Sequence, residues 1–143
     1  GHSALINALG FGAFNRRFRP VRTEMDWLTR DEAEVDKYVA DPLCGGPFTC
    51  GLWLDFLGGL FDLGSDHGLA RIPAELPILI TGGSADPVGG EQGMSRLAAH
   101  YIQTSHQRVQ QKIYPEGRHE MLNEVNREDV TADWLNWIDA AVS

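Results

Sequence analysis

Two strand-like runs in the second half of the chain, the first of them apolar, decide the fold. The first, Pro77-Ile78-Leu79-Ile80-Thr81, leads into Gly82-Gly83-Ser84-Ala85-Asp86-Pro87-Val88-Gly89. The second, Val109 to Tyr114, leads into Pro115-Glu116-Gly117-Arg118-His119-Glu120. Short apolar runs that end in glycine-containing loops are typical of buried strands. The sequence therefore predicts strands over residues 78–82 and 109–114.

An amphipathic helix is expected after each strand, over residues 89–104 and from about 127 to 142. Both segments repeat apolar side chains at helical spacing. The repeats consist of Met94, Leu97, Ala98 and Tyr101 in the first helix, and of Val130, Trp134, Trp137, Ile138 and Ala141 in the second. Asn126 is a candidate N-cap of the second helix. Strand, helix, strand and helix in this order predict an α/β fold with a right-handed parallel crossover.

The first half of the chain is predicted to be helical. Thr29 and Glu32 have the spacing of a capping box, and Pro42 is expected to end the helix that follows them. Thr49 is expected to cap a second helix with a wide apolar face. We divide the chain into a helical lid region, residues 1–70, and an α/β core segment, residues 71–143.

Two parallel strands are too few for an independent sheet. Parallel sheets are normally buried on both faces inside larger α/β layers. We therefore expect the chain to be the end of a larger fold. The free sheet edge would be covered by the missing N-terminal part or by a second copy of the chain.

The composition excludes several classes of protein. The chain has 143 residues and a net charge of −8, which disfavours nucleic-acid binding because such proteins usually carry a basic face. A short basic cluster is interpreted as a solvated surface; it consists of Arg16, Arg17, Arg19 and Arg22. No apolar run approaches the roughly 18 residues that a membrane span needs, and no secretory leader opens the chain, so we expect a cytoplasmic protein.

The two cysteines, Cys44 and Cys50, are expected to be reduced thiols in that compartment. No Cys/His cluster has the spacing of a zinc site, and neither a metal nor an organic cofactor is expected.

Asp86 and His119 are the candidate catalytic residues. Each follows one of the two predicted strands, and active sites of open α/β sheets lie at the carboxyl ends of strands. Taken singly, Asp86 could be an ordinary turn aspartate and His119 an exposed loop histidine. Taken together, an acid and then a histidine after successive strands match the last two members of a Ser–Asp–His triad.

A serine nucleophile is missing from this arrangement. The elbow that presents such a serine has the pattern Gly-x-Ser-x-Gly and follows a strand. Gly1-His2-Ser3 begins this pattern, but position 5 is Leu5 and no strand precedes it, so we interpret these residues as left over from cloning. The other serines considered also lack an elbow: Ser65, Ser84, Ser95 and Ser105.

The sequence resembles the C-terminal half of the lysophospholipase and monoacylglycerol lipase-like α/β-hydrolases, a grouping that also carries the label serine aminopeptidase S33. The resemblance covers residues 4–143. Its motifs are Phe14-Asn15 with Phe18, Thr23-Glu-Met-Asp-Trp-Leu-Thr-Arg-Asp, Tyr38-Val-Ala-Asp-Pro-Leu-Cys, Pro77 to Gly89, Tyr114-Pro-Glu-Gly-Arg-His-Glu-Met-Leu-Asn-Glu and Trp134-Leu-Asn-Trp.

The resemblance implies that Asp86 is the triad acid and His119 the general base, with the nucleophile in an N-terminal half that this chain lacks. It implies a lid whose helices shape an acyl-chain pocket, with Trp53, Phe56 and Phe61 as candidate lining residues. Alternatively, these side chains pack on a neighbouring helix.

The expected function is part of a serine hydrolase that cleaves acyl glycerol or lysophospholipid esters, with the chain alone inactive. Two alternatives remain open: a self-associating module without activity, and an aminopeptidase that uses the same triad.

Overall fold

The computed structural model describes all residues, 1–143. The core is a two-stranded parallel sheet of β1 (Ile78–Gly83) and β2 (Val109–Tyr114), joined through α5 (Gly90–Gln103). The strands pair in register from Ile78 opposite Val109 to Gly83 opposite Tyr114. This confirms the predicted α/β fold with parallel strands. The first strand is one residue longer than expected, and α5 begins and ends one residue inside its predicted bounds.

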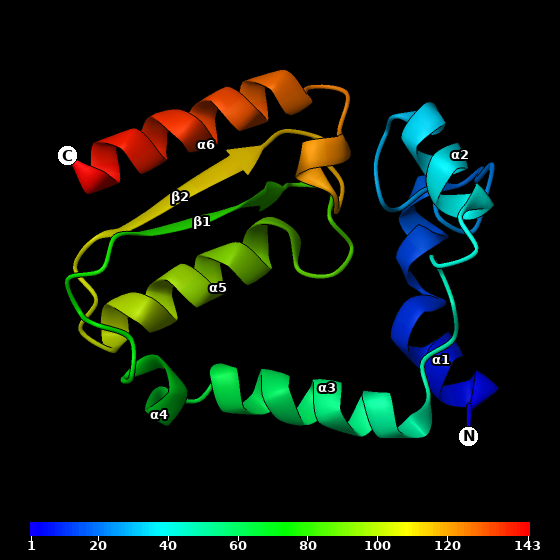
Figure 1. The fold of residues 1–143 in the computed structure, drawn as a ribbon, viewed down its shortest axis with the longest axis horizontal. Coiled ribbons are helices and arrows are strands. Elements are labelled where there is room, and N and C mark those ends of the chain that lie inside the picture. Colours follow the sequence, from blue (N-terminus) through cyan, green and yellow to red (C-terminus); the bar gives the residue numbers. More distant parts are fainter.

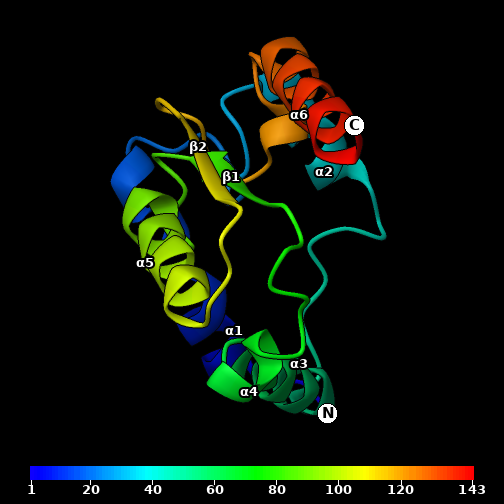
Figure 2. The same cartoon turned by 90° about the vertical axis from the view of Figure 1, so that its left-hand side faces the viewer.

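Helices cover both faces of the sheet. In Figure 2, which looks along the strands, α5 lies on one side and α6 (Arg127–Val142) on the other. A small core packs β2 against α6 and the turn before that helix. It consists of Tyr114 from β2, Met121 from the turn and Val130 from α6, with Trp134 packed against it. The Trp134 indole also donates a hydrogen bond to Thr81 Oγ1 over 3.3 Å. The first two residues of the predicted repeat, Val130 and Trp134, are therefore turned toward the sheet, whereas Ile138 is 48% exposed.

The N-terminal third lies beyond the carboxyl ends of the strands. Its elements are α1 (Ala4–Phe11), the 3₁₀ turn η1 (Phe14–Phe18) and α2 (Glu32–Ala40). In Figure 1 both strand arrows point toward these elements, and the 3₁₀ turn η2 (Met121–Asn123) lies between them and the sheet. This placement brings the loop around residue 27 to the edge where active sites of α/β sheets form.

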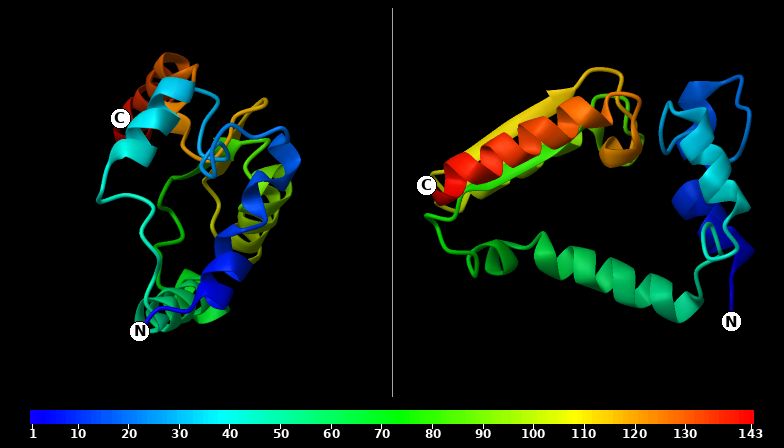
Figure 3. Two further views of the ribbon diagram at one scale, coloured as in Figure 1. Left: turned by 90° about the vertical axis from the view of Figure 1, so that its right-hand side faces the viewer. Right: turned by 45° about the horizontal axis from the view of Figure 1, so that its top comes forward.

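The remaining helices connect this end to the start of β1. Helix α3 (Cys50–Leu63) and the short α4 (Asp66–Leu69) cross to the opposite end of the molecule. The right-hand view of Figure 3 shows the sheet layer, α3 and the α1–α2 pair as three sides of an open frame. Only 15 of the 143 residues are buried, because many side chains of this frame have no layer packed over them.

One predicted helix cap, Thr29, is wrong, and a second, Asn126, is confirmed in position only. Asp31, rather than Thr29, caps α2 and accepts from the amides of Ala33 and Glu34. Thr29 is instead buried and donates its hydroxyl proton to the carbonyl of Asn123 over 2.9 Å. Asn126 stands at the N-cap of α6 but makes no side-chain cap. Its Oδ1 accepts from Arg30 Nη2 over 3.2 Å. In both cases the side chain bonds to a group about ninety residues away in the sequence instead of making the predicted cap, and Thr29 Oγ1 also accepts from the Asp31 amide over 3.0 Å.

Two other predicted helix boundaries are confirmed, the start of α3 and the end of α2. Thr49 caps α3 by accepting from the Leu52 amide over 3.1 Å. Helix α2 ends at Ala40, just before Pro42, which disfavours a helical residue ahead of it.

The expectation that both faces of the sheet are buried holds only in part. In β2 the Gln110, Gln111 and Lys112 side chains are exposed. The sheet contains no strand besides β1 and β2, so each has one edge without a strand partner. The division at residue 70 into a lid region and a core segment stays a prediction. None of the helices is long and apolar enough to span a membrane.

Candidate active site

Asp86 lies in the tight loop that follows β1. Its amide donates to the Gly83 carbonyl over 3.2 Å, which closes the turn, and its Oδ1 accepts from the Val88 amide over 2.9 Å. The side chain is 18% exposed. The carboxylate is thus held in one orientation by the backbone of its own loop.

His119 lies in the loop that follows β2, and its Nδ1 faces Asp86. Nδ1 is 3.1 Å from Asp86 Oδ2 and 3.2 Å from Asp86 Oδ1. The two loops are held together by backbone bonds from Ser84 to Tyr114 and from Ala85 to Gly117, each 2.9 Å. The structure therefore brings the two predicted site residues into contact at the carboxyl ends of neighbouring strands.

Each partner shifts the pKa of the other. The hydrogen bond with Asp86 raises the pKa of His119 above its usual value, and partial burial opposes this only in part. Burial would raise the pKa of Asp86, but the hydrogen bonds from His119 and the Val88 amide outweigh it and lower that pKa. The pair therefore favours an imidazolium facing a carboxylate, the arrangement that a triad acid and base adopt when the base has taken a proton.

Trp27 covers one side of His119. The two rings have centroids 5.0 Å apart and planes inclined by 44°. Trp27 is itself buried, with Phe14 packed 4.8 Å away. The indole thus shields part of the imidazole from water, although the His119 side chain remains 38% exposed.

Four further residues surround this pair, and no sequence pattern indicates a role for them: Trp27, Arg30, Arg118 and Glu124. All four occur in the motifs that carry the family resemblance, which marks these segments as similar to the family. The resemblance does not say which side chains these residues contact. Arg118 directly precedes His119, and its guanidinium donates to the carbonyls of Asp26 and Thr29. Glu124, which has no exposed surface, accepts from Arg30 and Arg118.

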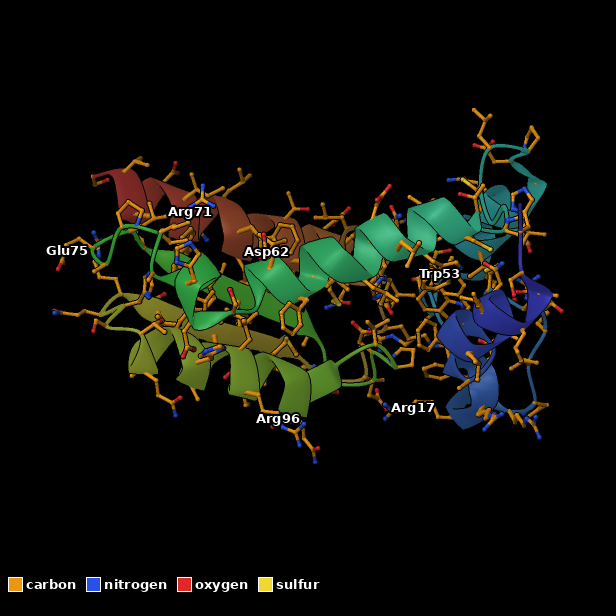
Figure 4. All side chains as sticks on the ribbon, turned by 90° about the horizontal axis from the view of Figure 1, so that it is seen from below. Arg17, Trp53, Asp62, Arg71, Glu75 and Arg96 are labelled. Carbon is orange, nitrogen blue, oxygen red and sulfur yellow. The ribbon has the colours of Figure 1, made fainter.

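The three predicted lining residues lie on α3 rather than beside Asp86 and His119. Trp53 is buried among Phe11, Phe48 and Phe56, with ring centroids 5.1 to 6.1 Å away. Figure 4 shows Trp53 at the end of α3 nearest the N-terminal helix. A Cβ at Gly10 would overlap the Trp53 ring, so this packing requires a glycine there.

Phe56 and Phe61 are less covered. Phe56 is 46% exposed and Phe61 82% exposed. The role of the three α3 aromatics in substrate binding stays a prediction.

The Ser3 and Ser84 hydroxyl oxygens accept backbone hydrogen bonds. Ser3 caps α1 by accepting from the Ile6 amide over 3.3 Å, and Ser84 accepts from the Glu116 amide over 2.9 Å. Position 5 is Leu5, where a nucleophile elbow has a glycine two residues after the serine. No three or more His, Cys, Asp or Glu side chains are grouped so that they could hold a metal ion.

Two solved structures are similar to this chain in fold. A thermostable carboxyl esterase from Bacillus coagulans, in complex with glycerol, matches 99% of this chain and 47% of its own length with a TM-score of 0.86 and 22% identity. A monoacylglycerol lipase from Paleococcus ferrophilus matches 97% of this chain and 53% of its own length with a TM-score of 0.71 and 17% identity. The chain thus spans about half the length of each.

Among curated protein sequences, none matches the chain. The sequence profile of the family described as serine aminopeptidase S33 matches residues 5–126. This range includes both strands, Asp86 and His119. Together with the shared fold, it shows that the chain belongs to the serine aminopeptidase S33 family of α/β-hydrolases.

Proposed function

We propose that the chain supplies the acid and the base of a serine hydrolase that cleaves carboxylic esters of the acyl glycerol or lysophospholipid type. The observation that carries this proposal is the contact of His119 Nδ1 with the Asp86 carboxylate, 3.1 Å away, at the carboxyl ends of β1 and β2. A carboxylate on Nδ1 fixes the tautomer and leaves Nε2 as the proton acceptor.

In the proposed reaction a serine hydroxyl gives its proton to His119 Nε2 and attacks the acyl carbonyl. The imidazolium then gives that proton to the leaving alcohol, and an acyl-enzyme remains. Water then attacks this intermediate while His119 takes one of its protons. The bond between the serine oxygen and the acyl carbon breaks, His119 returns the proton to the serine oxygen, and the fatty acid leaves. Asp86 stays ionised throughout and stabilises the imidazolium.

The serine and the oxyanion donors come, in this proposal, from a segment outside the chain. The chain spans about half of each matching hydrolase, which supports such a segment. Exposed apolar side chains on α3 support it too, because Leu54, Phe61 and Leu63 are 71 to 82% exposed. A surface of this kind indicates a face that another layer of protein covers. The rest of the hydrolase fold would supply that layer.

The ester substrate is supported by the two matching structures, one named a carboxyl esterase and the other a monoacylglycerol lipase. The aromatic side chains of Trp53, Phe56 and Phe61 would then line the path of the acyl chain. An aminopeptidase would use the same acid and base. The two classes are separated by comparing hydrolysis of p-nitrophenyl butyrate with that of an aminoacyl p-nitroanilide.

A self-associating module is the alternative that the structure also supports. The exposed face of α3 and the two unpaired strand edges would then be covered by a second copy of the chain. This alternative requires no upstream serine, so the gene sequence discriminates between the two readings.

The test begins with the gene that encodes this chain. We expect a reading frame that carries Gly-x-Ser-x-Gly within a segment on the order of 150 residues on the amino-terminal side. The product of that frame should hydrolyse p-nitrophenyl butyrate, whereas this chain alone should not. A frame without such a motif would favour the self-associating module.

Single substitutions in that product test the roles of the two residues. Asp86→Asn should lower kcat about 10⁴-fold and His119→Ala by at least as much. His67→Ala changes an exposed histidine in α4 and serves as the matched control. Retention of the full rate by His119→Ala would exclude it as the base.

A further inference from the structure

A fully buried carboxylate lies five residues after His119. The Glu124 side chain has no exposed surface. Its Oε1 accepts from the amides of Arg30 and Arg118 over 3.2 and 2.9 Å. Its Oε2 accepts from Arg30 Nε and the Val125 amide over 2.9 and 3.0 Å. Four donors on one carboxylate compensate for its removal from water, as a buried charge requires.

The donors come from two parts of the chain that are far apart in sequence. Arg30 follows the Trp27 loop, whereas Arg118 and Val125 belong to the segment around His119. Glu124 therefore joins the loop that covers the imidazole to the loop that carries it.

Both neighbours of His119 are fixed to the same loop. The Arg118 amide donates to Glu124, and the Arg118 guanidinium donates to the carbonyl of Thr29 over 3.1 Å and to that of Asp26. On the other side, the Glu120 amide donates to the Leu28 carbonyl over 2.8 Å. Hydrogen bonds on both sides restrict the backbone torsions that set the direction of the His119 side chain.

We propose that Glu124 is a positioning residue: through Arg30 and the Arg118 amide it holds the His119 loop against the Trp27–Arg30 segment, so that the imidazole faces Asp86. This inference rests on the proposed function in one respect: the orientation of His119 serves catalysis only if His119 is the base. The geometry itself can be tested without turnover, on this chain alone.

The matched pair of variants is Glu124→Gln and Glu116→Gln. Glu116 belongs to the same loop and also lies near Arg30, with 3.8 Å between its Oε2 and Arg30 Nη1, but its side chain is 88% exposed. An exposed pair of this kind contributes little. Glutamine at 124 keeps the size of the side chain but replaces one acceptor oxygen by a donor group that faces Arg30 Nε.

The readout is the titration of the His119 ring, followed by long-range ¹H–¹⁵N NMR of the ¹⁵N-labelled chain. Contact with Asp86 keeps the His119 midpoint above the usual value of 6.5. In Glu124→Gln we expect the loop to move away from Asp86 and the His119 midpoint to fall toward 6.5, whereas Glu116→Gln should leave the midpoint unchanged. The ring signals of His106, buried near the start of β2, report that the fold is retained.

A second pair of variants covers the case in which Glu124→Gln does not fold. Arg30→Met removes the side-chain donor but leaves three amides on Glu124, and it should lower the His119 midpoint in the same direction. Arg30→Lys restores a cation and should recover part of the shift. Folded Glu124→Gln or Arg30→Met protein with an unchanged His119 titration would overturn the proposal. So would loss of the fold in both, because the network would then be only structural.

Failure of this inference and failure of the proposed function give different results. If Glu124→Gln lowers the midpoint but the complete reading frame shows no esterase activity, the positioning role stands and the proposed function is wrong. If the complete protein is active and Glu124→Gln retains both kcat and the His119 midpoint, the inference is wrong and the function stands.

Discussion

Gly83, the last residue of β1, packs directly against the backbone of Gly117 in the loop after β2. A Cβ at Gly83 would overlap the Gly117 carbonyl, and a Cβ at Gly117 would lie 3.1 Å from the Gly83 Cα and 2.8 Å from Met121 Sδ. Only glycine lets the two backbones approach this closely. This contact, with the hydrogen bond from Ala85 to Gly117, sets the distance between the loops that carry Asp86 and His119.

Replacing Gly83 by alanine should therefore separate the two loops. The overlap involves a backbone carbonyl, which cannot rotate away, so we expect a loss of stability of about 3 kcal/mol. Urea unfolding monitored by circular dichroism measures this loss, and NMR should show the His119 titration midpoint falling toward 6.5.

Gly58→Ala is the control for this substitution. Gly58 lies in the interior of α3, and nothing is within 4 Å of a Cβ placed there. Because alanine favours a helix more than glycine, this variant should gain about 1 kcal/mol. Equal stability of the two alanine variants would contradict the close approach.

The contribution of the Asp86–His119 pair to stability should depend on pH. Because the pKa of His119 is raised, its hydrogen bond with Asp86 stabilises the fold fully below about pH 6.5. This stabilisation is lost as the pH rises through the raised pKa. Because the pKa of Asp86 is lowered, its ionised form stabilises the fold above about pH 3.8. This stabilisation is lost as the pH falls through the lowered pKa. His119→Gln should therefore lower the free energy of unfolding more at about pH 5.5 than at about pH 9. An equal loss at both values would show that the pair is not ionised as described.

The same pKa shift predicts a pH profile for the proposed hydrolase. In the proposed reaction His119 must be neutral to accept a proton, so kcat/KM of the complete protein should rise with pH through a midpoint above 6.5. Asp86→Asn removes the charge that raises the pKa of His119, and its residual activity should show a lower midpoint. A midpoint that stays in place would assign the profile to another group.

Trp27 should influence His119 directly, and Trp53 should not. Both indoles are buried, at 8% and 7% exposure, so leucine at either position should lower stability by about 1–3 kcal/mol. Only Trp27 lies against the imidazole. Trp27→Leu should therefore change the ring-proton shifts of His119, while Trp53→Leu leaves them unchanged in NMR spectra of the chain.

The exposed face of α3 should make the isolated chain self-associate. Leu54 and Phe61 are 75% and 82% exposed, and both lie on this helix. The double variant Leu54→Gln/Phe61→Gln should lower the mass measured by light scattering at high concentration. Leu43→Gln, at a position 92% exposed but outside α3, is the control. A chain that is monomeric before any substitution would exclude self-association through this face.

The sequence by itself determined the elements of the core and their order. The strand-like run before Pro115 and the helical repeat of α6 predicted Val109–Tyr114 and Arg127–Val142 with their observed bounds. These features follow from local periodicity, which reports which face of a strand or helix is buried. The order of Asp86 and His119 after successive strands was likewise readable, because parallel strands place their carboxyl ends at one edge.

Only the tertiary structure decided what surrounds that pair. Thr29 and Asn126 have the side chains of helix caps, yet their oxygens bond to groups about ninety residues away, at Asn123 and Arg30. Glu124 is buried against Arg30, and Trp27 packs on His119. These contacts also join residues that are far apart in the sequence. A polar or aromatic side chain can choose among many partners, and no local periodicity encodes which one folding brings within reach. The sequence therefore placed the acid and the base on neighbouring loops, and long-range packing determined how they are held.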